Sequence, residues 1–96
     1  MDKVYCVAVT LAKPEHVESV KAALEALIEP VREEKGGLQY EMYCDRNEPR
    51  RFVFIERWES YEDFEAHVNA PHVQDFLAKT QGMIEENFFH PLYKHM

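Results

Sequence analysis

Residues 52–76, FVFIERWESYEDFEAHVNAPHVQDF, decide the predicted fold, because an apolar strand runs directly into a capped helix. Glu56 and Trp58 lie near the end of the strand, and His67 lies in the helix. A carboxylate and an imidazole placed among aromatic side chains are unusual in so short a segment. If all three side chains point into one cavity, that cavity is a candidate functional site.

The two ends of this segment define further elements. The largely apolar residues 51–59 predict a strand. Ser60, with Asp63 three positions later, predicts the start of a helix. Pro71 then begins another helix. We expect one face of that last helix to carry Val73, Phe76, Leu77, Thr80 and Ile84.

The first half of the chain supplies two strands and one long helix. Residues 4–11 and 38–44 predict strands, and residues 45–50 (DRNEPR) predict the turn of a hairpin. Between the strands, spacings of three and four predict a helix that starts near Pro14 and ends at the Gly36-Gly37 pair, with its last turn weakened by Pro30. Its apolar stripe is Val17, Val20, Leu24, Leu27 and Val31.

The last strand is expected at residues 88–93, where Pro91 suggests an edge position or a bulge. The order β-α-β-β-α-(α)-β is that of the ferredoxin-like split βαβ fold. We therefore expect an α+β domain over residues 1–96, with a four-stranded antiparallel sheet and helices on one face. The first strand should lie between the third and the fourth.

The predicted sheet has two apolar faces. In the third strand Phe52, Phe54 and Trp58 point one way, whereas Val53 and Ile55 point the other way. Helices on one side would leave the second face in water, which soluble monomers rarely tolerate. We therefore expect a homodimer that packs sheet against sheet.

Composition limits the partners and the location. The 96 residues carry a net charge of -7, which argues against nucleic acid and anionic membranes. No apolar run approaches the roughly 20 residues of a membrane span, and no signal-peptide pattern is evident, so we expect a cytoplasmic protein. Cys6 and Cys44 lack metal-site or redox spacing, and we expect no disulfide.

The pattern IERWES, followed by AH and then by PH with a later aromatic, resembles the antibiotic biosynthesis monooxygenase domain family. The stretch EEKGGLQY at residues 33–40 extends the resemblance towards the first strand. It implies a dimeric α+β barrel built from ferredoxin-like protomers. Members similar to this chain include cofactor-independent quinol monooxygenases, an enzyme that processes a phosphorylated autoinducer, and haem-degrading enzymes. The haem-degrading branch carries Trp where His67 stands here, which argues against haem degradation.

Two side chains are candidates for acid and base chemistry. Glu56 shares the parity of Phe54 and Trp58, so it faces an apolar layer that raises the pKa of a carboxylic acid. His67 lies on the inner side of its helix, where a neutral imidazole could accept a proton from a phenol or an enol. A structural ion pair for Glu56, and a backbone hydrogen bond for His67, are the alternatives.

Trp58, Tyr40, Met42 and Phe76 are candidates to line a pocket for an aromatic ligand, although each is also an ordinary core residue. His72, at a helix start, is interpreted as a capping or surface residue. The spacing of the histidines predicts no metal site, and no motif for an organic cofactor is present.

The resemblance implies oxygenation of a small phenol or quinol by O₂, with His67 and Glu56 as catalytic residues and without a cofactor. Two alternatives remain: an isomerase or related enzyme for a small phosphorylated metabolite, and a non-catalytic dimer that binds small molecules. A phosphorylated substrate would need a cationic side chain to bind its phosphate group, and the pocket candidates include no Arg or Lys.

Overall fold

The computed structural model describes residues 3–96, and its eight elements follow the predicted order. The predicted strands at residues 4–11, 38–44 and 51–59 are each within one residue of the observed bounds. The elements are β1 (Val4–Ala12), a 3₁₀ turn (Pro14–His16), α1 (Val17–Arg32), β2 (Gly37–Cys44), β3 (Arg51–Trp58), α2 (Tyr61–Val68), α3 (Pro71–Lys79) and β4 (Ile84–Leu92).

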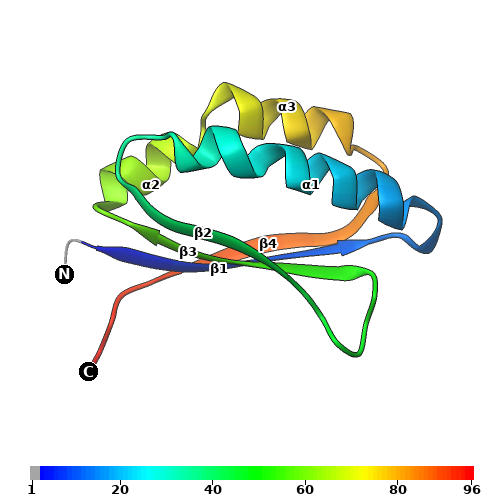
Figure 1. Ribbon diagram of the computed structural model, residues 1–96, viewed down its shortest axis with the longest axis horizontal. Coiled ribbons are helices and arrows are strands. Elements are labelled where there is room, and N and C mark those ends of the chain that lie inside the picture. The colour runs from blue at the N-terminus through cyan, green and yellow to red at the C-terminus, as the bar shows by residue number, and fades with distance from the viewer. Residues whose placement is uncertain (1–2) are drawn as a thin grey trace.

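One antiparallel sheet carries all the helices on a single face (Figure 1). The strand order is β2-β3-β1-β4, so β1 lies between β3 and β4. This confirms the predicted α+β ferredoxin-like arrangement. Pro91 lies in β4, an edge strand, as its missing backbone donor predicts. Cys6 and Cys44 lie on non-neighbouring strands and are both free.

The core forms where β3 faces the helices. Phe52, Phe54, Glu56 and Trp58 are all buried, and each alternates with a side chain that is not. The helices cover this face with the apolar stripe of α1, whose members Val20, Leu24, Leu27 and Val31 are buried. Trp58 is 0% exposed and is the largest fully buried side chain.

Helix α1 continues through Pro30 and ends two residues later, at Arg32. The proline donates no backbone hydrogen bond, and the chain leaves the helix through tighter bonds. The amides of Glu33 and Glu34 donate to the carbonyls of Pro30 and Val31, respectively. Pro30 therefore lies in the last turn of the helix, and the helix ends at Arg32, before the Gly36-Gly37 pair that was expected to end it.

Helix α2 begins as predicted, because the Asp63 amide donates to the Ser60 hydroxyl at 3.1 Å. The prediction that α3 extends to Ile84 is wrong. Gly82 adopts φ +82 in a turn after the helix, and Ile84 already pairs with Ala12 of β1. Strand β4 therefore starts four residues before the expected position.

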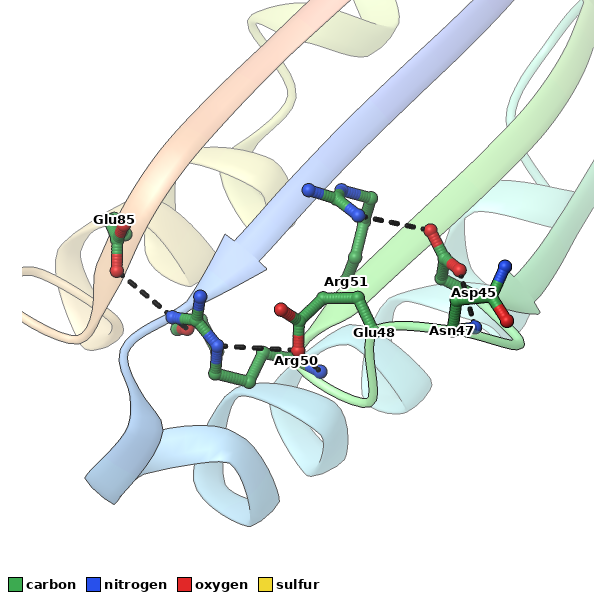
Figure 2. Close-up of polar contacts among 7 residues, drawn as sticks. Asp45, Asn47, Glu48, Arg50, Arg51 and Glu85 are labelled. Carbon is green, nitrogen blue, oxygen red and sulfur yellow. Dashed lines mark hydrogen bonds and ion pairs between the residues drawn. The ribbon is translucent and has the colours of Figure 1, made fainter.

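A set of ion pairs fixes the β2–β3 hairpin and ties it to β4 (Figure 2). Arg51 contacts Asp45 across the base of the hairpin at 3.1 Å. Arg50 contacts Glu48 within the turn at 3.4 Å and reaches Glu85 at 3.0 Å. Arg50 also donates to the carbonyl of the last β1 residue at 3.0 Å. This end of the sheet is therefore held by side chains from three segments.

The second face of the sheet has no helix over it (Figure 1). Val7 pairs with Ile55, and Val9 pairs with Val53 and Phe88, so apolar side chains lie next to one another across three strands. Ile55 is 40% exposed and Phe88 is 42% exposed. The predicted second apolar face is therefore present.

The loop between α1 and β2 approaches α2 very closely at Gly36. This glycine has φ +79, and a Cβ built on it would overlap the Asp63 side chain. The Gly36 carbonyl also accepts a hydrogen bond from the Glu59 amide at 2.8 Å. The absence of a side chain at position 36 therefore lets this loop lie against the start of α2.

Gly36→Ala should destabilise the fold more than Gly82→Ala. Both residues have positive φ, which costs a non-glycine residue about 1–2 kcal/mol. Position 82 has open space around its Cβ, so only Gly36→Ala adds a clash, worth roughly 1–3 kcal/mol. Urea unfolding of both variants at one protein concentration measures the difference, and equal losses of stability would contradict the close approach.

Candidate functional site

A cavity of about 90 Å³ lies between the sheet and the helices and opens to solvent. Its wall is largely apolar and comes from all four strands and from α1, α2 and α3, with Tyr40 as the contribution of β2. The exposed side chains of Leu77 and Phe89 belong to this wall and mark its opening. The other lining residues are Cys6, Ala8, Thr10, Leu24, Leu27, Tyr40, Phe54, Glu56, Phe64, His67, Val68, Val73, Phe76 and Asn87.

Glu56 is a buried carboxyl group, 4% exposed, that faces this cavity because it shares the inward parity of β3. Its Oε1 accepts a hydrogen bond from the Trp58 indole N–H at 2.9 Å. Burial raises the pKa of Glu56 to about 7, although the Trp58 hydrogen bond favours the charged form. Near neutral pH this side chain can therefore either hold or accept a proton.

His67 lies on the inner face of α2, 7% exposed. Its ring stacks on Trp58, with centroids 4.6 Å apart, and meets the edge of Tyr40 at 5.7 Å. Nδ1 lies 3.0 Å from Glu34 Oε1, and Nε2 lies 3.9 Å from Glu56 Oε1. The structure therefore brings Glu56, Trp58 and His67 together, but only Glu56 and His67 line the cavity.

The two ring nitrogens of His67 have different roles. Burial lowers the pKa of His67, and this effect exceeds the opposing attraction of the Glu34 carboxylate. The ring is therefore mostly neutral at pH 7. Because the carboxylate can only accept, we assign the single proton to Nδ1. Nε2 then carries a free lone pair on the side of Glu56.

Sequence reasoning missed Glu34 as part of the site and placed His72 at the surface. Glu34 uses its second oxygen, Oε2, to contact His72 Nε2. The side chain of His72 is 31% exposed, whereas that of Glu34 is only 14% exposed. The PH pair and the EEKGG loop were visible in the sequence, but only the tertiary fold shows that these segments meet at His67.

The predicted pocket residues divide into two groups. Tyr40 and Phe76 line the cavity and are buried. Trp58 and Met42 are not among the lining residues that the structure describes. Trp58 lies behind His67 and supports both it and Glu56, while Met42 packs against the edge of the core.

Other polar groups also line the cavity. Thr10 donates to Asn87 Oδ1 at 2.8 Å. The sequence analysis missed this contact because it placed Asn87 before the start of β4. Burial raises the pKa of the Tyr40 hydroxyl well above its ordinary value and raises the pKa of the Cys6 thiol to about 12. Tyr40 and Cys6 therefore stay protonated at neutral pH.

Within residues 3–96, no cluster of three or more His, Cys, Asp or Glu side chains has the arrangement of a metal site. No helix in the same range is long and apolar enough to cross a membrane. The cytoplasmic location stays a prediction.

Comparisons with known proteins identify a family for this chain. The model of the family described as "Antibiotic biosynthesis monooxygenase" matches residues 4–79. The candidate monooxygenase YcnE of Bacillus subtilis is 29% identical over 72 residues, which cover 75% of this chain and 76% of YcnE. The protein sll1783 of Synechocystis is 29% identical over 82 residues, 85% of this chain, but the match spans only 56% of sll1783.

Solved structures share the whole fold. The crystal structure of PA3566 from Pseudomonas aeruginosa superposes with a TM-score of 0.92 at 29% sequence identity. The match covers 100% of this chain and 97% of PA3566. The arrangement of sheet and helices is therefore common to this chain and to PA3566.

Glu56→Gln should stabilise the protein at alkaline pH relative to the wild type. The folded-state pKa of about 7 exceeds the value of about 4.3 for an unfolded Glu, so ionising Glu56 costs stability as pH rises between them. Glutamine keeps an oxygen for Trp58 but cannot ionise. The variant should gain about 3 kcal/mol on the wild type between about pH 4 and about pH 8.

Urea unfolding at both pH values checks this expectation, with the exposed Glu25→Gln as a control that should show no such gain. A pH-independent difference between Glu56→Gln and the wild type would show that the carboxyl group titrates normally.

Proposed function

The chain belongs to the antibiotic biosynthesis monooxygenase family, and we propose that it oxygenates a small phenol or quinol with O₂, without a metal or organic cofactor. One observation carries the proposal. A neutral His67 presents a free Nε2 beside Glu56 in a cavity that is otherwise largely apolar. That arrangement suits removal of a proton from a weakly acidic hydroxyl group.

The distance between His67 and Glu56 leaves room for a substrate oxygen. Nε2 and Oε1 are 3.9 Å apart, too far for a direct hydrogen bond. A hydroxyl oxygen about 2.8 Å from each atom would contact both. His67 would accept its proton, while Glu56, when protonated, would donate a hydrogen bond to the phenolate that forms.

The overall reaction balances with O₂ as the sole oxidant. A phenolate gives up electrons far more readily than the neutral phenol, so proton removal starts the reaction. A phenol with a ring C–H and one O₂ yield a quinone and one water. One oxygen atom becomes the new carbonyl group and the other leaves in the water, so the substrate supplies all four electrons.

The cavity wall suits a flat aromatic ring. Tyr40 stacks on Phe54 with centroids 4.7 Å apart, and three further aromatic side chains, Phe64, Phe76 and Phe89, also line the cavity. Such a wall binds a planar ligand by apolar contact and excludes water from the reacting atoms. Trp58 takes a supporting role behind His67 in this proposal.

The alternative substrates find less support. Among the lining residues that the structure describes there is no Lys or Arg. A phosphorylated metabolite needs cationic side chains or other strong hydrogen-bond donors to bind its phosphate group. Binding without turnover remains the outcome to expect if the test below shows no oxygen consumption.

We also propose that two chains pack through their second sheet faces, as the apolar residues on that face first suggested and the family resemblance also implies. The exposed side chains on that face include Tyr43, Ile55, Phe88 and Leu92, each at least 40% exposed. Covering them removes apolar area from water and joins two open sheets into a barrel-like assembly.

His67→Ala should lower kcat for 1,4-dihydroxynaphthalene by about 100-fold or more, because a positioned base contributes about 10²–10⁴-fold. Oxygen consumption at an electrode, with one O₂ used per quinone formed, measures the rate. Stability should fall much less than activity, and His95→Ala, at an exposed position near the chain end, should retain full activity. Unchanged turnover in His67→Ala would reject His67 as the base.

Ile55→Glu should convert the dimer into a monomer, because it places a charge at the centre of the second sheet face. Sedimentation equilibrium at micromolar concentration measures the mass. Ala26→Glu, on the exposed side of α1, is the matched control and should stay dimeric. A wild-type monomer under these conditions would reject sheet-to-sheet packing.

A further inference from the structure

Glu34 joins two histidines that come from different helices. Its Oε1 lies 3.0 Å from His67 Nδ1 on α2, and its Oε2 contacts His72 Nε2 at the start of α3. Both oxygens of one carboxylate are therefore used, each on a different imidazole ring. The loop that carries Glu34 is held against α2 by the close approach at Gly36.

Glu34 does not belong to the cavity wall. It lines a separate hollow on the outer surface, together with Lys35, Glu62, Asp63 and two alanines. His72 is likewise absent from the cavity lining in the part of the chain that the structure describes. A ligand in the cavity would therefore touch His67 but neither Glu34 nor His72.

We propose that Glu34 is the positioning residue for the base His67, and that His72 in turn anchors Glu34. The proposal rests on the proposed function for the role of His67 as a base. Glu34 holds the His67 proton on Nδ1, so that Nε2 stays free towards the cavity. His72 donates to the other oxygen and so prevents the carboxylate from rotating away.

The same contact stabilises the charged ring. When His67 accepts a proton at Nε2, the ring gains a positive charge beside the Glu34 carboxylate, so Coulomb attraction adds to the hydrogen bond that Nδ1 already donates. Glu34 therefore contributes more after proton transfer than before it. An interaction of this kind raises kcat and leaves KM little changed.

Several titratable groups lie around His67, and Glu34 and His72 among them shift its pKa. They are Glu34 from the loop after α1, His72 from α3, Glu56 from β3 and Tyr40 from β2, with Cys6 of β1 on the same cavity wall. Glu34 raises the pKa of His67 through its charge and its hydrogen bond, whereas a charged His72 lowers it. Removing the Glu34 charge should therefore lower the pKa of His67.

An NMR titration of ¹⁵N-histidine-labelled protein tests the contact without any substrate. In Glu34→Gln the midpoint of His67 should fall by about one pH unit, the size expected for loss of a charged hydrogen bond. The neighbouring exposed Glu33→Gln is the matched control and should leave the midpoint unchanged. An unchanged His67 midpoint in Glu34→Gln would overturn the proposal.

Kinetics with 1,4-dihydroxynaphthalene test the consequence for catalysis. Glu34→Gln should lower kcat by about tenfold or more with KM within about twofold. The acid limb of its kcat/KM profile should move to lower pH with the NMR midpoint. His72→Gln keeps a donor for Glu34 and should retain most of the activity, whereas His72→Ala should not. Equal activity of these two variants would overturn the anchoring role of His72.

The two proposals fail in different ways. If the wild type consumes no oxygen with this substrate, the oxygenase function is lost, but the titration of His67 still decides whether Glu34 positions it. If the wild type turns over and Glu34→Gln matches it in kcat and in the His67 midpoint, the function survives and the positioning role is rejected.

Discussion

The two-residue period of β3 is the constraint on which both faces of this protein depend. Hydrogen bonding to β1 and β2 fixes the register of β3, so Phe52, Phe54, Glu56 and Trp58 must all face the helices. The same register turns Ile55 to the bare face. One strand therefore supplies the carboxyl group of the cavity, its hydrogen-bond donor, and part of the apolar surface on the opposite side.

Burying Glu56 and His67 side by side costs free energy, and hydrogen bonds to neighbouring side chains offset part of that cost. A buried carboxylate and a buried imidazolium are both costly, and burial pushes Glu56 and His67 towards their neutral forms. The Trp58 N–H satisfies one oxygen of Glu56, and Glu34 satisfies one nitrogen of His67. His67 Nε2 and Glu56 Oε1 then lie 3.9 Å apart, without a direct hydrogen bond between them.

Periodicity in the sequence predicts most of the fold and one part of the site. The apolar spacing of α1 and the alternation of β3 are local, so they were readable without coordinates. The end of α3 could not be predicted in this way, because Ile84 fits the apolar spacing of the helix. In the structure the chain turns at Gly82, and Ile84 pairs with Ala12 of β1 instead. Glu34 and His72 were missed for a similar reason, since their contact joins residues 38 positions apart. Trp58 shows the reverse case: its burial was predicted, but whether it faces the cavity or lies behind His67 depends on three-dimensional packing.

If the cavity makes a quinone, as we propose, the protonated state of Cys6 has a further consequence. Quinones alkylate thiolates rapidly, and a reactive cysteine on the wall would be consumed by the product. Burial raises the pKa of Cys6 to about 12, so almost no thiolate exists at neutral pH. Cys6 therefore acts on β1 as a small apolar side chain, and its sulfur stays chemically inert. Under the proposed function, the burial that shapes the cavity would also protect it from its own product.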